Sequence, residues 1–182
     1  MKSYSEWRQA IADEIQAMKQ TTAVWKVNEH VIIDCNGHAL NHCGYELIER
    51  ALHKACFKQL GVTEQTVSFS QPVGYCECVH TAPHDSIIYV QREGRKGVSR
   101  FVLNRDPALC NSVFLVLKKK PGNKVLLITA FVGTKSEVEP WDKKATLTSI
   151  EFWKHHALVA THDMSLSDDR GDKYYWNKQV NK

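Results

Sequence analysis

The hydrophobic and polar positions near the start of the chain follow a helical period. Apolar residues recur every three or four positions, at Trp7, Ile11, Ile15 and Met18. This spacing is typical of an amphipathic helix. Ser3 and Glu6 stand before it in the order of a capping box. The pattern predicts a helix from about Ser5 to Lys19.

A short extended segment and a second helix are predicted next. Val31 to Ile33 form a β-like run that the Asn36-Gly37 turn signal closes. A broad apolar stripe follows at helical spacing, formed by Leu47, Ile48, Ala51, Leu52, Ala55 and Cys56. It predicts a helix from about Gly44 to Leu60, with Gly61 as its left-handed C-cap.

The second half of the chain changes to strand-like patterns. Four β-like runs succeed one another, at Ser86–Arg92, Val98–Arg105, Ser112–Lys120 and Lys124–Gly133. The links between them are short, so consecutive strands are expected to be antiparallel neighbours. The third run is apolar on both faces, and we expect it in the centre of the sheet. After the fourth run, Thr148 and Glu151 suggest a capping box for a short helix through residues 149–158.

Together these elements predict an α+β fold, in which N-terminal helices precede a four-stranded, mainly antiparallel sheet, with a C-terminal helical extension. We expect a single domain over residues 1–164, with its core at about 31–133. Residues 165–182 are polar and aspartate-rich, and are expected to form a tail.

Composition narrows the class of protein. Hydrophobic residues make up 43% and charged residues 24% of the 182 residues, which suits one ordinary core. The N-terminus has no apolar signal-peptide segment, and the longest apolar run, Val125 to Val132, is too short to cross a bilayer. We therefore expect a cytoplasmic protein with reduced thiols and no membrane partner.

The charge is mildly basic and unevenly distributed. The formal net charge is +4. Five cations fall within fourteen positions: Arg92, Arg95, Lys96, Arg100 and Arg105. Such a run is usually a solvated turn, but it also suits an anionic partner such as nucleic acid.

Cysteine and histidine residues raise two alternatives. Cys76, Cys78, His80 and His84 are zinc-ligand types, but the chain has no Cys-x-x-Cys pair, and we interpret the two cysteines as structural thiols. Cys43 is a candidate nucleophile beside a histidine, although a buried small residue is the simpler interpretation. Gly-rich phosphate loops are absent from the sequence, so no cofactor is expected.

A third group of residues fits metal-free cleavage of RNA. His84 precedes the first long strand, Arg92 ends it, Arg100 lies in the second strand and Thr129 interrupts the most apolar one. A histidine can transfer protons near neutral pH, and an arginine suits phosphate. His80 is the substitute candidate for the proton transfer.

The stretch "HDSIIYVQREGRKGVSRFVLNRDP" and the later "VLLITAFVG" resemble the metal-independent RNase superfamily that groups barnase, EndoU, colicin nucleases and RelE, in particular its phage-borne and toxin members. The resemblance covers roughly residues 31–133. It implies that His84 is the general acid or base, that Arg92 or Arg100 binds phosphate, and that Thr129 is the hydroxyl of the last strand. His42 would match a helix-borne histidine.

Two functional hypotheses are consistent with these residues. The first is a ribonuclease of toxin or phage type, with RNA as substrate and an inhibitory or immunity protein as a further partner. The alternative is a non-catalytic module that binds protein or nucleic acid through a basic strand face or through the surface around Trp141 and Trp153. A zinc-stabilised domain is a third hypothesis.

Overall fold

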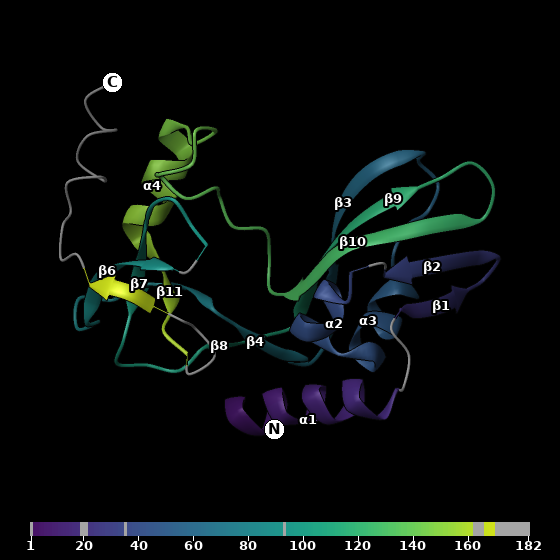
Figure 1. Ribbon diagram of the computed structural model, residues 1–182, viewed down its shortest axis with the longest axis horizontal. Helices are drawn as coiled ribbons and strands as arrows, with labels where there is room; N and C mark the ends of the chain where they lie inside the picture. The colour runs from purple at the N-terminus through teal and green to yellow at the C-terminus, as the bar shows by residue number, and fades with distance from the viewer. Residues whose placement is uncertain (1, 19–21, 35, 93, 162–165, 170–182) are drawn as a thin grey trace. The chain divides into compact units, whose positions relative to one another are not determined.

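The computed structural model describes residues 2–18, 22–34, 36–92, 94–161 and 166–169. The chain forms two compact units, each with its own sheet (Figure 1). Unit 1 comprises Met1–Cys76 and Leu109–Lys135, and unit 2 comprises Glu77–Ala108 and Ser136–Lys182. The predicted end of the first helix at Lys19 and most of the predicted tail lie outside the described residues.

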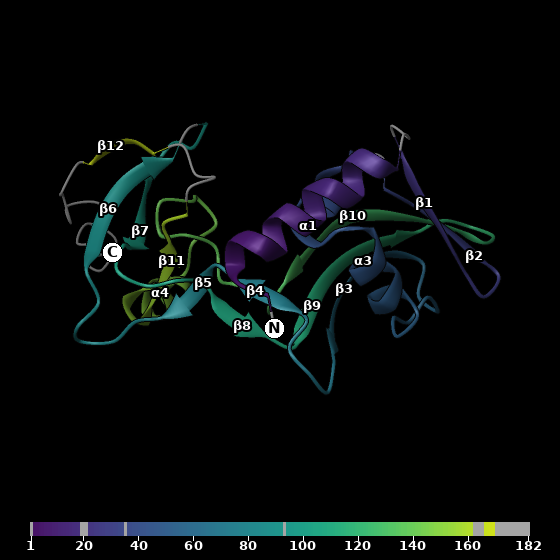
Figure 2. The same ribbon diagram turned by 90° about the horizontal axis from the view of Figure 1, so that it is seen from below.

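Unit 1 combines a five-stranded sheet with three helices. Its elements are α1 (Tyr4–Ala17), β1 (Ala23–Val27), β2 (His30–Asp34), α2 (His38–Cys43), α3 (Tyr45–Leu52), β3 (Gly61–Ser68), β4 (Gly74–Cys76), β8 (Ala108–Cys110, which starts in unit 2), β9 (Ser112–Lys119) and β10 (Lys124–Val132). The sheet order is β1-β2-β10-β9-β3 (Figure 2). All neighbours are antiparallel except β2 and β10, which are parallel. β4 and β8 form a separate two-stranded sheet.

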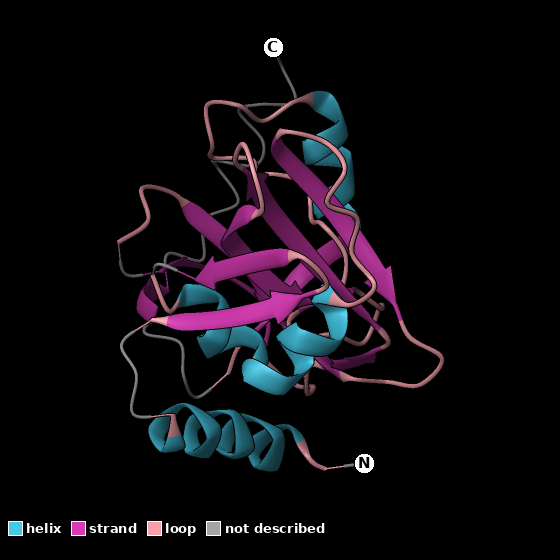
Figure 3. Cartoon of the chain, turned by 90° about the vertical axis from the view of Figure 1, so that its right-hand side faces the viewer, coloured by secondary structure: helices cyan, strands magenta, loops and turns pink. Residues whose placement is uncertain are grey.

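The helices of unit 1 bury one face of the sheet. Figure 3 shows the helices of this unit on one side of the strands. α2 packs on β10, and α1 contacts both α2 and α3. Ala39, Leu40 and Cys43 of α2 share a core with Leu127 and Ala130 of β10. Alternating strand residues face opposite sides of a sheet, so the intervening residues of β10 lie on the face away from the helices.

The first predicted helix and the first predicted strand are confirmed. α1 begins after Ser3, whose hydroxyl and backbone form the predicted capping box with Glu6. The predicted extended run at Val31 to Ile33 is β2. The third predicted strand is β9, which has a neighbour on each side, β10 and β3, so it is an interior strand, although the strand at the centre of the sheet is β10.

The second predicted helix is shorter than expected. α3 ends at Leu52 rather than near Leu60, and Gly61 opens β3 instead of capping the helix. The side chain of Gln65 on β3 satisfies the backbone of Cys56, accepting from its N–H at 2.8 Å and donating to its carbonyl at 2.6 Å. These bonds replace the helical ones that an extension of α3 would have made, because a backbone group needs a partner when it leaves water.

Unit 2 is built around a second five-stranded sheet. Its elements are β5 (Cys78–His80), β6 (Ile87–Arg92), β7 (Val98–Val102), α4 (Leu147–His155), β11 (His156–Val159) and β12 (Leu166–Asp169). The sheet order is β12-β6-β7-β11-β5. A small core of Val79, Val102, Ala157 and Val159 holds β5, β7 and β11 together.

The coarse α+β prediction is confirmed, but the predicted single four-stranded sheet is wrong. β6 pairs with β7 and β9 pairs with β10, each antiparallel as expected. The two hairpins, however, belong to different sheets. β7 pairs instead with β11 in parallel, and β9 pairs with β3. The two hairpins were expected to pair with each other. Instead, strands distant in the sequence, β11 and β3, pair with β7 and β9.

The C-terminal extension is partly helical. α4 is capped by Thr146 and Ser149 rather than by the predicted Thr148 and Glu151, and the chain continues directly into β11. No helix in the described ranges is long and apolar enough to cross a membrane. Because compact units can still fold together, the boundaries of one domain at 1–164 stay a prediction.

Candidate active site

Three imidazoles meet on one side of unit 2, and we call them the three-histidine surface (His80, His155 and His156). The antiparallel register of β5 and β11 places His80 directly opposite His156. His155 is the last residue of α4 and precedes β11. The rings of His80 and His155 are nearly parallel, at 11°, with centroids 6.1 Å apart. The ring of His156 lies 5.1 Å from that of His80, at 75°.

Backbone hydrogen bonds hold the helix end and the strand loop together at this surface. The backbone N–H of Thr81 donates to the carbonyl of His155 at 2.8 Å, and its hydroxyl donates to the same carbonyl at 3.2 Å. Arg100 Nη1 donates to the carbonyl of His156 at 2.8 Å and to that of Trp153 at 3.3 Å. Thr81 and Arg100, both in unit 2, therefore hold the backbone carbonyls of His155 and His156 in place.

The hydrogen bonds of the rings set their tautomers. His80 Nδ1 lies 3.1 Å from the carbonyl of Thr81, and His156 Nδ1 lies 2.8 Å from that of Phe152. A carbonyl oxygen only accepts, so Nδ1 carries the hydrogen in each ring. In the neutral form Nε2 then holds the lone pair. His80 is exposed, whereas His156 is half-buried and stacked on Phe152, with centroids 3.8 Å apart. His80 thus presents the more accessible base.

His155 has a different environment. Its Nε2 lies 3.3 Å from Glu151 Oε1, and its side chain is 59% exposed. A hydrogen bond and the positive charge of Lys154, together with the bond to His155, hold the pKa of Glu151 below its usual value. The carboxylate therefore stays ionised near neutral pH and accepts a hydrogen bond from an N–H at His155 Nε2. One imidazole whose Nε2 is left as an acceptor and a neighbour whose Nε2 carries a hydrogen suit general acid–base chemistry.

A cation lies beside His80. Arg105 Nη1 donates to the carbonyl of His80 at 3.1 Å and to Asp85 Oδ2 at 3.2 Å. The backbone N–H of Ala82 and the charge and hydrogen bond of Arg105 hold the pKa of Asp85 below its usual value. The Arg105 side chain is still 33% exposed, so it can also meet an anion.

The sequence-predicted residues of unit 2 have distinct surroundings. His84 is exposed in the loop that Ala82 and Asp85 close, with its carbonyl held by Asn104. Arg92 forms an ion pair with Glu139 and donates to Ser99 Oγ. Arg100 is half-buried against protein carbonyls, which makes it a positioning residue in this structure. Both arginines are therefore engaged by groups of the protein itself.

The two candidates of unit 1 do not share one site. His42 lies on α2, on the helical side of the sheet, with its ring 4.6 Å from that of His38. Thr129 pairs with Val116, between the core residues Leu127 and Ala130, just after a bulge in β10. It therefore lies on the opposite face. Burial, together with the nearby charges of His38 and Arg8, lowers the pKa of His42 to about 4.

Sequence reasoning missed His155 and His156 as site residues, although a histidine pair at the end of a predicted helix was visible, and it grouped Arg105 with the basic run without assigning it a role in the reaction. In the described part of the chain, no three or more His, Cys, Asp or Glu side chains are grouped so as to hold a metal ion. Comparison of the chain with protein-family models, curated proteins and solved structures finds no match.

Proposed function

We propose that this protein is a metal-independent ribonuclease of toxin or phage type, and that the three-histidine surface carries its proton transfers. The observation that supports this most is the 6.1 Å pairing of the His80 and His155 rings, with His80 Nδ1 bonded to the Thr81 carbonyl and His155 Nε2 bonded to the Glu151 carboxylate. Two imidazoles in opposite protonation states are what cleavage by 2′-OH attack requires.

In the proposed reaction, His80 acts as the general base and His155 as the general acid. Nε2 of His80 takes the proton of the ribose 2′-OH while the 2′ oxygen bonds to phosphorus. The P–O5′ bond breaks, its electron pair leaves with the 5′ oxygen, and the imidazolium of His155 protonates that oxygen. The products are a 2′,3′-cyclic phosphate and a 5′-OH. Arg105 stabilises the charge that gathers on the phosphate oxygens.

The order of elements in unit 1 gives secondary support. Helices α2 and α3 precede β3, β9 and β10, which form one antiparallel run of a sheet. This order matches only part of the superfamily resemblance drawn from the sequence, because the strands that carry Arg92 and Arg100 lie in unit 2. In this proposal His84 remains a further proton-transfer candidate from the exposed loop, and an inhibitory or immunity protein remains an expected partner.

The test is cleavage of a single-stranded RNA in the presence of a chelator. We expect His80→Ala and His155→Ala each to reduce the rate by about 10²-fold or more. The matched control is His53→Ala, because His53 is an exposed histidine of unit 1, and it should leave the rate unchanged. Full activity of both site variants, or loss of activity in His84→Ala alone, would show that the assignment is wrong.

The alternative, a non-catalytic binding module, would use the basic strand face that the sequence predicts. Arg95 and Lys96, between β6 and β7, are exposed. Exposed cations suit an anionic partner such as RNA. Salt-sensitive RNA binding without any cleavage would support this alternative over the first.

A further inference from the structure

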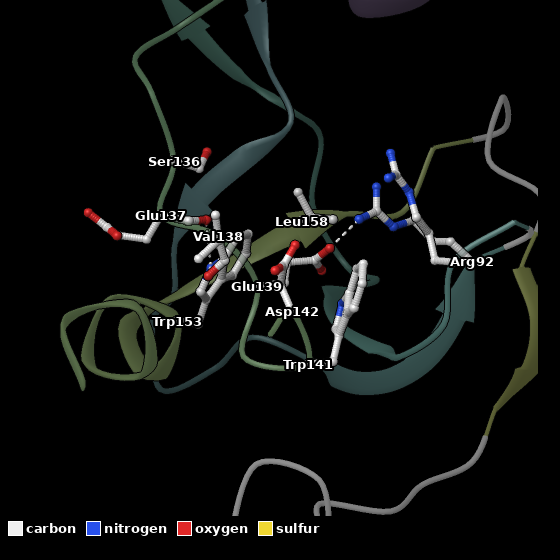
Figure 4. Close-up of a pocket in the computed structure, with 10 residues that line it drawn as sticks. Arg92, Ser136, Glu137, Val138, Glu139, Trp141, Asp142, Trp153 and Leu158 are labelled. Carbon is white, nitrogen blue, oxygen red and sulfur yellow. Dashed lines mark hydrogen bonds and ion pairs between the residues drawn. The ribbon is translucent and has the colours of Figure 1, made fainter. Parts of the chain in front are cut away.

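A cavity of about 270 Å³ lies in unit 2, away from the three histidines. Its wall includes Arg92 at the end of β6, Trp153 of α4 and Leu158 of β11. The segment between β10 and α4 supplies Glu139, Trp141 and Asp142 (Figure 4). None of the three histidines lines the cavity, so a ligand bound in it would be independent of the ribonuclease proposal.

Glu139 is the unusual group of this cavity. Its side chain is only 10% exposed, and its Oε2 accepts a hydrogen bond from Arg92. Its Oε1 is buried, and no group among the described residues donates to it. A buried carboxylate oxygen without a donor is costly. A ligand that brings an N–H group to Oε1 would remove that cost.

Trp141 forms an aromatic wall beside this oxygen. Figure 4 shows its indole next to the carboxylates of Glu139 and Asp142. The ring packs directly on the backbone of Gly97, where an added Cβ would lie 2.1 Å from Trp141 Cγ. Gly97 therefore fixes the indole in place, and any larger residue there would displace it.

The charges of the wall select the type of ligand. Besides the Arg92–Glu139 pair, the carboxylate that the cavity offers is that of Asp142, because Glu137 is exposed and accepts a hydrogen bond from Ser149 Oγ. Arg92 is already neutralised by Glu139, and Arg95 is exposed. The unpartnered Glu139 Oε1 and the Asp142 carboxylate, beside an aromatic wall, disfavour phosphates and carboxylates and favour a cation that has N–H donors.

We propose that this cavity binds a guanidinium group, either the arginine side chain of a peptide or a small free guanidinium compound. The planar fork presents several N–H donors at once, so it can reach Glu139 Oε1 and the Asp142 carboxylate together. Its flat face suits stacking on the Trp141 indole. An ammonium ion is a more strongly hydrated point charge and satisfies this geometry less well.

The experiment follows the indole N–H signal of Trp141 by NMR in the full chain during titration with methylguanidinium, ethylammonium, guanosine monophosphate and a Gly-Arg-Gly peptide blocked at both ends. We expect saturable shifts with methylguanidinium and the peptide, and no shift with the nucleotide. The affinities for methylguanidinium and the peptide should each be at least tenfold higher than the affinity for ethylammonium. Peptide binding at least tenfold tighter than that of methylguanidinium identifies a peptide arginine as the source. Equal affinities identify a free compound.

Matched variants keep the result interpretable. Asp142→Asn should weaken the binding of methylguanidinium at least fivefold. Asp106→Asn, a substitution of the same kind at an exposed position, should leave this affinity unchanged. Gly97→Ala should weaken binding by displacing the indole. Glu139→Gln, if it remains folded, should weaken binding at least tenfold. Unsaturable shifts, equal binding of ethylammonium, preferred binding of the nucleotide, or unchanged affinity in Asp142→Asn would each overturn the proposal.

Discussion

The imidazole of His42 lies among groups that oppose its protonation. Burial is the largest cause, and His38 and Arg8 add positive charge nearby, so the pKa falls from 6.5 to about 4. Between pH 6.5 and pH 4 the unfolded chain binds a proton at this residue that the folded chain does not. The free energy of unfolding therefore falls as the pH drops through this window, and the contribution is constant below about pH 4.

We predict that His42→Gln removes this acid sensitivity. Compared with the wild type, the variant should lose less stability between pH 6.5 and pH 4, by on the order of 2 kcal/mol. Urea unfolding at several pH values measures the difference. His53→Gln, at an exposed histidine, should follow the wild-type curve. Parallel curves for wild type and His42→Gln would contradict the assigned cause.

The thiol of Cys110 is expected to be alkylated faster than that of Cys43. Hydrogen bonds from the thiol and the backbone N–H of Cys76 lower its pKa from 9.0 to about 7, whereas burial raises the pKa of Cys43. Alkylation of Cys110 by iodoacetamide should therefore reach half its maximal rate near pH 7, while Cys43 stays unmodified in the folded protein. Cys76→Ala should move the Cys110 midpoint upward. Peptide mass spectrometry measures both, and a wild-type midpoint near 9 would contradict this prediction.

The sequence identifies only some residues of the candidate site when its residues are considered one at a time. The stretch from Cys76 to Asp85 singles out His80 and His84, and His80 does lie in a histidine cluster. Alternation with Phe101 predicts Arg100 on an open face. Its Nη1 instead reaches the backbone of α4 and β11, which a local pattern cannot reveal because both acceptors come from a segment more than fifty residues away.

Helix α3 depends on a cap supplied by another helix. Its N-cap residue, Gly44, has no side chain that could cap it, and the Glu14 carboxylate of α1 accepts the backbone N–H groups of Tyr45 and Glu46, each at 2.8 Å. Gly44 also makes room for this carboxylate, because an added Cβ would lie 2.3 Å from Glu14 Oε2. These bonds join α1 to the rest of unit 1.

We predict that Glu14→Ala destabilises unit 1 by about 1–2 kcal/mol, because the first N–H groups of α3 lose both their acceptor and a favourable charge. Asp13→Ala is the control, since Asp13 is exposed on the same helix, and should change stability by less than about 0.5 kcal/mol. Chemical denaturation followed by circular dichroism measures both. Equal midpoints for the two variants would rule out the capping role.

Arg100 should behave as a positioning residue. It connects β7 to the end of α4, to β11 and to Thr81, so Arg100→Lys should lower the melting temperature as well as the cleavage rate. A residue that only binds phosphate would lower the rate without affecting stability. Differential scanning fluorimetry beside a cleavage assay separates the two, and an unchanged melting temperature with lost activity would restore the phosphate-binding role expected from the sequence.

Local periodicity predicted elements better than their boundaries. α1 and its capping box, β2 and the two hairpins could be recognised because the information lies within a few residues. The end of α3 could not, because the Gln65 side chain from β3 satisfies the backbone of Cys56. Such side-chain contacts depend on residues that the helical pattern does not include.

The arrangement of the two sheets could not be predicted from the sequence. The chain passes between the units after Cys76, Ala108 and Lys135, and each five-stranded sheet contains a parallel pair, β2 with β10 and β7 with β11. Parallel partners are distant in sequence, so short links between strands indicate hairpins but not which hairpins share a sheet. The prediction of one sheet failed for this reason.

The ribonuclease proposal is tested most directly by the chemistry of the RNA ends. The wild-type protein, with chelator present, should leave 2′,3′-cyclic phosphate and 5′-OH ends on a defined single-stranded RNA and should not cleave where a 2′-deoxynucleotide replaces the attacking residue. His80→Ala and His155→Ala should form these ends at least 10²-fold more slowly. Ends bearing 3′-OH and 5′-phosphate, cleavage at the deoxy position, or no cleavage of any RNA supplied would contradict the proposal.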